Sequence, residues 1–394
     1  MAENVLTSSP PTREDGGHNL LAWYREVRAS GTVWHEPAIG MWHVLDYPNV
    51  QRVLSDWNVF SSDLSVILSS QTFREGNYQL MDPPLHNKFR GLVNQAFTPR
   101  AVRRLEPRIA ELFRERLAEV DGLERFDLVE RIAHPVPVSV LAALLGVPDA
   151  DHGLLRGWAD DVFKMNFDDR LDPSKAKSVD EATMPMHDYF LDLVRERRKD
   201  PRDDLLSEVI QAQGEGGSMQ DEEAVTAAAG LLLAGHLTST LLLGSAVRCL
   251  HEHPEAAAAL REDPSEIPGF LEEVMRFYPP FSMVLRFTKT EVELDGQTIP
   301  ANSVVVPSLL AANRDPDHFS EPDRFDHRRN APNVAFGYGV HYCIGASLAR
   351  LEGRISVGML LERYSQISLD EAAPPEYFAA PGLFGPKRLP VVVS

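Results

Sequence analysis

The residue with the clearest potential for chemistry is Cys343, one of two cysteines among the 394 residues of the chain. It lies in the stretch Phe336–Gly345, whose glycines let the backbone approach a bulky group closely. Good helix formers occupy residues 346–352, so Cys343 is predicted to lie at or just before a helix N-terminus. The helix dipole and the unpaired N–H groups there favour a thiolate, the form that binds metals and attacks electrophiles.

A thiolate at this position could be a nucleophile, a zinc ligand or a haem ligand, and a buried structural cysteine is a further alternative. Zinc is disfavoured because no second cysteine lies at ligand spacing, and Cys249 falls in an apolar helical run. The ordered series Phe-x-x-Gly-x-His-x-Cys-x-Gly resembles the haem-binding loop of the cytochrome P450 family, whose cysteine thiolate is the proximal ligand of haem iron. The resemblance implies that haem b is the cofactor and that Cys343 binds its iron. The other loop residues that it places at the cofactor are Phe336, Gly337, His341 and Gly345.

A second candidate region is the long apolar helix predicted over residues 221–250. Small residues in its middle would let a flat group, or simply a packed neighbouring helix, approach the backbone. The sequence there is Ala234-Gly235-His236-Leu237-Thr238. It resembles the family's oxygen-binding helix, Ala-Gly-x-(Asp or Glu)-Thr, which implies that Ala234 and Gly235 lie against the haem. Thr238, helped by Ser239 or ordered water, would deliver protons, but Leu237 replaces the usual acid and puts the standard proton route in doubt.

Two basic residues, His86 and Arg90, are four positions apart after a pair of prolines that begins a predicted helix. Residues at this spacing share a helical face and can bind one anion, although most such pairs form an ordinary solvated face. The surrounding sequence is similar to the family's helix over the haem edge, which implies that both residues bind the haem propionates. Arg286 and His341 align with the family's other propionate-binding residues.

A structural role is implied for Glu273 and Arg276, which are three apart on a predicted helix and can form an ion pair. Glu-x-x-Arg alone is common and usually solvated. Here the downstream sequence 322–325 completes a resemblance to the family's buried Glu-Arg-Arg network, with Arg324 as its third member. Such a network would fix the segment that carries the haem-binding loop.

The composition favours one domain over residues 1–394, because no repeat or low-complexity linker interrupts the chain. Residues 1–17 are expected to be disordered or extended. A content of 43% hydrophobic residues suffices for a large core, and the net charge of −19 disfavours nucleic-acid binding. The two cysteines favour a reducing compartment, the N-terminus lacks signal-peptide features, and the apolar runs are shorter than the roughly 20 residues that span a bilayer. We therefore expect a cytoplasmic monomer that binds neither membrane nor nucleic acid.

The resemblance covers nearly the whole chain and implies a mainly α fold with small β-sheets, the triangular helical prism of the family. It also implies a monooxygenase that splits dioxygen with two electrons from NAD(P)H. Separate proteins must supply these electrons, because the segment after Cys343 is too short for a flavin domain. A ferredoxin and a ferredoxin reductase are the family's usual bacterial partners. Basic residues that could dock the ferredoxin, unless they form ordinary solvated faces, are Arg103, Arg104, Arg108 and Arg350.

The expected substrate is a mainly apolar small molecule that is hydroxylated or epoxidised, by analogy a secondary metabolite such as a polyketide or macrolide. The residues expected to line its pocket are Val66, Leu68, Leu233, Leu237, Val284, Leu285, Leu383 and Phe384. The missing acid leaves two alternatives open. One is a peroxide-driven haem enzyme that needs no redox partner, and the other is a non-catalytic haem or ligand carrier.

Overall fold

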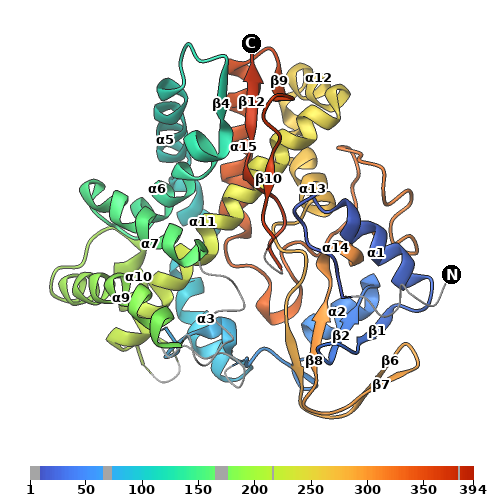
Figure 1. Cartoon of the computed structure of the whole chain (residues 1–394). Coiled ribbons are helices and arrows are strands. Elements are labelled where there is room, and N and C mark those ends of the chain that lie inside the picture. Colours follow the sequence, from blue (N-terminus) through green and yellow to red (C-terminus); the bar gives the residue numbers. More distant parts are fainter. Residues whose placement is uncertain (1–8, 65–72, 165–175, 215–216, 380–381) are drawn as a thin grey trace.

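A computed structural model describes residues 9–64, 73–164, 176–214, 217–379 and 382–394 of the chain. Most helices gather in one part of the molecule, and most strands lie in the other part, near the N-terminal helices (Figure 1). The structure is mainly helical with small sheets, as predicted.

The described helices have the following bounds: α1 (His18–Arg28), α2 (Tyr47–Ser55), α3 (Leu85–Ala96), α4 (Pro99–Arg104), α5 (Glu106–Glu119), α6 (Pro135–Leu144), α7 (His152–Lys164), α9 (Ala176–Lys199), α10 (Leu205–Gln211), α11 (Asp221–Glu252), α12 (Pro254–Glu262), α13 (Ile267–Phe277), α14 (Leu309–Ala312) and α15 (Ala346–Arg363). The strands are β1 (Val33–Glu36), β2 (Met41–Val44), β3 (Phe60–Ser61), β4 (Arg125–Asp127), β5 (Arg286–Thr288), β6 (Val292–Leu294), β7 (Gln297–Ile299), β8 (Val304–Pro307), β9 (Ile367–Leu369), β10 (Glu376–Tyr377), β11 (Pro386–Arg388) and β12 (Pro390–Val393).

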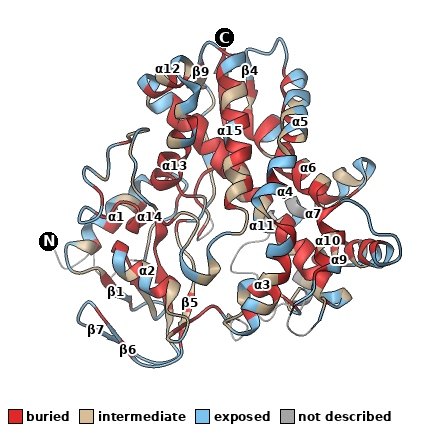
Figure 2. Cartoon of the chain, turned by 180° about the vertical axis from the view of Figure 1, so that it is seen from behind, coloured by how far each residue is buried: buried red, intermediate tan, exposed pale blue. Residues whose placement is uncertain are grey.

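Helix α11 is the centre of the helical part and crosses the molecule from side to side (Figure 1). Its 32 residues give it a length of about 48 Å. It packs against α6, α9, α13 and α15, and Figure 2 shows that much of its surface is buried. By length and composition it could cross a bilayer, but 67% of its most apolar window is buried inside the protein, as in a core helix.

The part of the molecule that contains most strands has a five-stranded sheet in the order β1-β2-β8-β5-β3. The predicted hairpin of β1 and β2 is confirmed, with Val33 opposite Val44 in an antiparallel register. Strand β2 then pairs in parallel with β8, and β8 pairs antiparallel with β5. The last pairing places Arg286, the first residue of β5, next to the loop that enters α3 and beside the cavity described below.

In the described part of the N-terminus, residues 9–12 have no regular structure, as expected for an extended segment. The expectation is wrong for residues 13–17, which form a turn that packs on the core. Arg13 is 6% exposed and donates from Nε to Ser282 Oγ at 3.3 Å. Gly17 lies so close to Phe384 that a Cβ at this position would meet its ring at 2.2 Å. The glycines and the turn let this segment pack closely beside β11. Hydrophobic patterning does not reveal such packing, because it depends on small residues and not on apolar ones.

Candidate active site

The segment of residues 336–345, here called the Cys343 loop, leads directly into α15. Gly345 is the N-cap residue of that helix, so Cys343 lies just before a helix N-terminus, as predicted. The Cys343 N–H donates to the Phe336 carbonyl at 2.9 Å and closes the loop. Gly339 has a positive φ of 72°, and a Cβ there would lie 2.9 Å from the Cα of Ser55. Only glycine satisfies both conditions.

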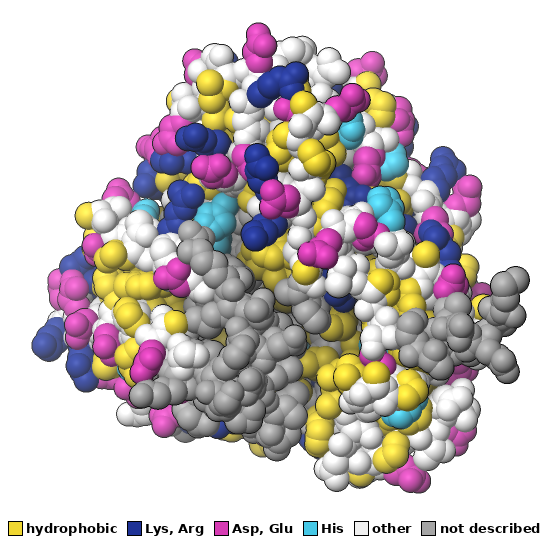
Figure 3. Space-filling model, viewed as in Figure 1, with side chains coloured by type: hydrophobic (Ala, Val, Ile, Leu, Met, Phe, Trp, Pro, Cys, Tyr) yellow, Lys and Arg dark blue, Asp and Glu magenta, His cyan; other side chains and the backbone are white. Residues whose placement is uncertain are grey.

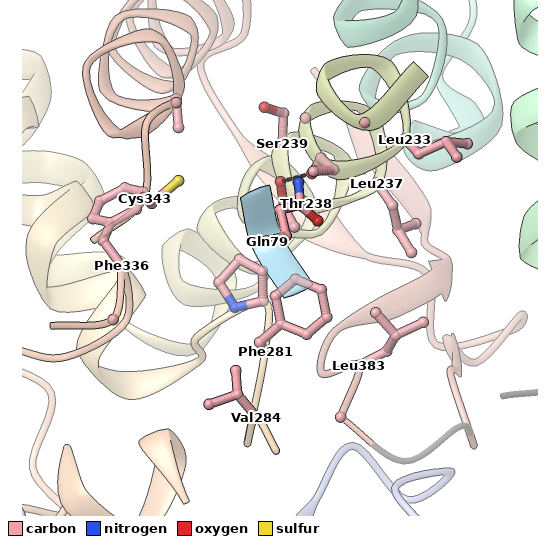
Figure 4. Close-up of a pocket in the computed structure, with 18 of the residues that line it drawn as sticks. Gln79, Leu233, Leu237, Thr238, Ser239, Phe281, Val284, Phe336, Cys343 and Leu383 are labelled. Carbon is pink, nitrogen blue, oxygen red and sulfur yellow. Dashed lines mark hydrogen bonds between the residues drawn. The ribbon is translucent and has the colours of Figure 1, made fainter. Parts of the chain in front are cut away.

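The Cys343 loop forms one wall of a cavity of about 1140 Å³. Figure 4 shows Cys343 and Phe336 on one side of this cavity and Thr238 and Ser239 of α11 on the other. The exposed surface of Cys343 faces the cavity, while the rest of the residue is surrounded by protein. Burial therefore raises the pKa of the thiol, and the N–H groups of Gly345 and Ala346 only partly offset this effect. The N–H groups at the helix terminus thus act in the predicted direction, and burial opposes them.

The opposite wall contains the predicted small-residue stretch of α11. Thr238 Oγ1 donates to the Ala234 carbonyl one turn earlier at 2.7 Å, so its lone pairs remain available to the cavity. Leu237 lines the cavity at the position of the missing acid. Gly235 also lines it, but a Cβ there would meet Leu141 of α6 at 3.1 Å. The glycine thus serves the helix contact that was the alternative interpretation, in addition to bordering the cavity.

The four predicted propionate-binding residues converge at one edge of the cavity. Arg90, Arg286 and His341 line it, and the ring of His86 lies 4.3 Å from that of His341. Arg286 donates to the Leu285 carbonyl at 2.8 Å and has no carboxylate ion-pair partner in the described residues. Burial lowers its pKa to about 10. Burial and the nearby Arg286 guanidinium lower the pKa of His341 to about 3.

This edge is a cluster of basic groups that forms no ion pair with a carboxylate of the described residues; the nearby acid, Asp82, pairs with Lys289 instead. The Nε2 atoms of His86 and His341 are both buried and have no hydrogen-bond partner in the described part of the chain. Buried basic and polar groups without partners are unfavourable, and two carboxylates would satisfy them. The cavity therefore fits a large flat group that presents carboxylates to this edge and a metal to Cys343, and haem has this form.

A functional residue that the sequence analysis missed is Glu352 of α15. Ser239 Oγ donates to Glu352 Oε2 at 2.5 Å, although the two residues are 113 positions apart. Glu352 is 5% exposed, and burial raises its pKa to about 7. The carboxyl group therefore binds a proton near neutral pH within reach of a cavity-lining hydroxyl. The sequence contains no signal for this role, because Arg350 and Arg354 flank Glu352 and make it look like one charge among several on a helix.

The ion-pair network below the Cys343 loop differs from the prediction in one member. Glu273 and Arg276 form the expected pair, with two contacts of 2.7 and 2.8 Å, and both are 1% exposed. The third cation is Arg329, whose Nε lies 3.2 Å from Glu273. The predicted Arg324 is wrong: its guanidinium is 63% exposed and pairs with Glu321. Arg324 contributes only its carbonyl, which accepts from Arg276 and Arg329.

The predicted substrate pocket is largely part of this cavity. Leu233, Leu237, Val284, Leu285 and Leu383 all line it. Phe384 does not, because it is 2% exposed and packs against Tyr278 instead. Val66 and Leu68 lie outside the described residues. A further wall that was not predicted consists of Phe73, residues 77–80 and the aromatic side chains Phe97, Phe281 and Phe378. Figure 3, which has the same view as Figure 1, shows hydrophobic side chains in the hollow near the centre of the molecule.

Comparisons with known proteins agree with this geometry. A family model described as Cytochrome P450 matches residues 18–391. Erythromycin C-12 hydroxylase of Saccharopolyspora erythraea is 41% identical over 354 residues, covering 89% of this chain and 88% of that protein. Cyclomarin C epoxidase CymV of Salinispora arenicola is 38% identical over 389 residues, 98% of each protein. Among solved structures, ligand-free cytochrome P450 TbtJ1 gives a TM-score of 0.91 at 42% identity and covers 98% of this chain and 100% of that one. A mutant of P450 EryK in complex with erythromycin B gives a TM-score of 0.90 at 39% identity, with coverage of 97% and 98%.

Proposed function

The chain belongs to the cytochrome P450 family of monooxygenases, and we propose that it hydroxylates or epoxidises a mainly apolar secondary metabolite of the polyketide or macrolide class. The observation that carries this proposal is the cavity in which Cys343 faces Thr238 beside a cluster of basic groups that have no ion-pair partner in the described residues. The apolar lining suits a hydrophobic substrate. The relatives named as a macrolide hydroxylase and a cyclomarin epoxidase support the substrate class.

Haem b is the cofactor that these residues would hold. Cys343 would supply the thiolate ligand, and Arg90, Arg286, His86 and His341 would bind the two propionates. When bound, a haem with a thiolate ligand activates dioxygen so that one oxygen atom can enter the substrate. Binding of a metal also removes the proton from the thiol, which burial otherwise retains.

Proton supply is assigned to Ser239 and Glu352, with Thr238 at the cavity surface. Glu352 retains a proton near pH 7 because its carboxyl group is buried without a cation. For proton transfer the hydroxyl would turn, so that the protonated carboxyl group donates to Ser239 Oγ while the Ser239 O–H gives its own proton to water in the cavity; the contact between the two groups allows this relay. This pair would replace the carboxylate that is absent at Leu237.

The proton-supply step can be tested by comparing hydrogen peroxide release with product formation in Glu352→Gln, Leu237→Glu and wild type. Loss of the Glu352 carboxyl group should raise peroxide release per product on the order of tenfold, since a positioned acid contributes about 10²- to 10⁴-fold to a proton transfer. Introduction of an acid at position 237 in the Glu352→Gln protein should restore part of the coupling. Unchanged coupling in both variants would contradict the assignment.

Electrons are expected to come from NAD(P)H through a ferredoxin and its reductase. Three of the four predicted docking residues have acidic partners: Arg104 pairs with Glu208, Arg108 with Glu111, and Arg350 with Glu272. Arg104 and Arg350 still expose 59% and 40% of their side chains. We therefore expect a salt-sensitive interaction of modest strength, in which Arg103 contributes a further charge.

The proposed function is tested by the reduced carbon monoxide spectrum and by turnover. The red-shifted Soret band of thiolate ligation should appear in wild type and be absent from Cys343→Ala. Turnover of candidate macrolides with NADPH, ferredoxin and reductase should exceed turnover with hydrogen peroxide. The opposite order would identify the peroxide-driven alternative, and a thiolate spectrum without any oxidised product would favour a ligand carrier.

A further inference from the structure

One end of the cavity contains polar side chains that form no hydrogen bonds with the described residues. Gln79, in the short 3-10 turn Tyr78–Leu80, lines the cavity opposite α11. Its carboxamide faces Gly230, where a Cβ would lie 3.8 Å from Gln79 Nε2. Thr226, one turn earlier on α11, lines the same cavity and is 5% exposed. Within the described part of the chain, neither the carboxamide nor the Thr226 hydroxyl forms a hydrogen bond.

The backbone that carries Gln79 is held in place. Asn77 Oδ1 accepts from the Gln79 N–H at 3.2 Å, and Asn77 Nδ2 donates to the Phe73 carbonyl at 3.1 Å. Gly76 lies against α11, since a Cβ there would meet Glu223 Cα at 2.9 Å. The turn is therefore fixed against the helix, and the backbone position from which the Gln79 side chain extends is set before any ligand binds.

This polar corner, defined by Gln79 and Thr226, lies in an otherwise apolar wall that includes Leu231 and Leu233. When a ligand fills the cavity, water leaves the carboxamide and the hydroxyl. A ligand that offers no hydrogen bond leaves both groups unpaired, which is strongly unfavourable, whereas a matching polar group restores the lost bonds. A site of this kind selects for ligands with the polar group and rejects those without it.

The distance between this polar corner and the reaction centre sets the minimum length of a ligand that contacts both. Gly230, which lies beside Gln79, is eight residues from Thr238 on α11, about 12 Å along the helix, and Thr226 is twelve residues from Thr238, about 18 Å. Gly230 and Thr238 both face the cavity, and Figure 4 shows Gln79 beside α11 near Thr238 in a view in which the turns of the helix overlap. A ligand that reaches both points must be an extended or large molecule.

We propose that Gln79 and Thr226 form the specificity subsite of this enzyme and bind an amide or a hydroxyl-and-carbonyl group of the substrate, about 12 to 18 Å along α11 from Thr238. The inference rests on the proposed function, because it takes the end near Thr238 and Cys343 as the reaction centre. It narrows the substrate class to large molecules with an apolar reacting end and a hydrogen-bonding remote end.

The test uses the haem-containing protein and probes that are anchored at the metal. Each probe carries an imidazole, whose binding to haem iron shifts the Soret band, a linear spacer of variable length and a terminal carboxamide. A matched series ends in isopropyl, which has a similar shape and no hydrogen-bonding atoms. Spectral titration gives the dissociation constant of each probe for wild type, Gln79→Leu, Thr226→Val and Leu233→Met, the last being an apolar control in the same wall.

We expect the carboxamide to bind about three- to tenfold more tightly than the isopropyl probe at spacers that reach the polar corner, and equally at shorter spacers. Gln79→Leu and Thr226→Val should reduce this preference, whereas Leu233→Met should change both probes of a pair alike. A preference absent at every spacer length, or unchanged in both polar variants, would overturn the inference. A protein whose Soret band does not respond to imidazole itself would instead overturn the proposed function, and the inference with it.

Discussion

Below the Cys343 loop, Glu273 contacts two guanidinium groups, whereas Arg286 at the cavity and Glu352 beside Ser239 each lack an ion-pair partner in the described residues. Glu273, Arg276, Glu352 and Arg286 are buried, and Arg329 exposes only 12% of its side chain, so the difference is not one of exposure. Glu273 also accepts the Asp326 N–H at 2.9 Å, and Arg276 donates to the carbonyl groups of Asn313 and Pro322. The first region therefore satisfies its own charges.

The comparison separates a structural role from a functional one. A buried ion pair that is completely satisfied fixes the path of the chain, here the irregular segment that leads into the Cys343 loop. A buried charge without a partner either changes its protonation state or requires a ligand. Glu352 changes its protonation state, whereas Arg286 requires a ligand of opposite charge. The two regions should consequently respond to substitution in different ways.

Glu273→Ala should have the largest effect, because it leaves Arg276 and Arg329 buried without a carboxylate. We expect the free energy of unfolding to fall by about 3 to 5 kcal/mol and haem incorporation to fall with it. Denaturant unfolding and the haem-to-protein ratio measure the two effects. The neighbouring Glu272→Ala is the matched control, since Glu272 and Arg350 are 34% and 40% exposed and their pair is worth about 1 kcal/mol or less. Equal losses in the two variants would contradict the distinction.

Glu352→Gln should alter the pH dependence of stability. The carboxyl pKa is about 7 in the folded protein, above its ordinary value of 4.5, so the folded state retains a proton that the unfolded chain releases. The free energy of unfolding therefore falls as pH rises from about 5 to about 7, by about 3 kcal/mol in total. Glutamine does not ionise and removes this loss, so the variant should match wild type near pH 5 and exceed it above pH 7. Urea unfolding across this range measures the effect, and parallel pH profiles would show that Glu352 is not the titrating group.

Arg286→Leu should have opposite effects on the protein with and without haem. Without haem the buried guanidinium forms no ion pair within the described part of the chain, so its removal should not lower the free energy of unfolding. With haem the variant loses a charge-assisted hydrogen bond to a propionate, and the cofactor should dissociate on the order of tenfold faster. Haem transfer to apomyoglobin gives the dissociation rate. A loss of stability in the haem-free protein would indicate that Arg286 has a structural role.

Local spacing predicted the parts of the site that lie within one element. Glu273 and Arg276 meet because they are three apart on α13, and the Cys343 loop and the start of α15 follow from the glycines and the helix formers. Contacts between distant elements were not predictable from the spacing of residues along the sequence. Ser239 and Glu352 meet only because α11 packs against α15, and no periodicity in either helix specifies that contact.

Irregular and extended segments account for the two wrong side-chain assignments. Leu383 lines the cavity while its neighbour Phe384 packs away from it, because successive residues in extended chain point to opposite sides. Arg324 and Arg329 both lie in the segment between α14 and the Cys343 loop, which has no repeating geometry. Only the folded path shows which of the two side chains turns inward.

The difference between Arg324 and Arg329 leads to the prediction with the smallest expected change in the free energy of unfolding. Arg324→Ala should change the free energy of unfolding by about 0.5 kcal/mol or less, because Arg324 and Glu321 form a pair whose side chains are 63% and 65% exposed. Arg329→Ala should be clearly more destabilising, since Arg329 contacts Glu273 and donates to the carbonyl groups of Ser320 and Glu321. Parallel denaturant unfolding of the two variants measures the contrast. Equal losses would mean that position 324 belongs to the buried network after all, because an exposed pair screened by water cannot account for an effect of that size.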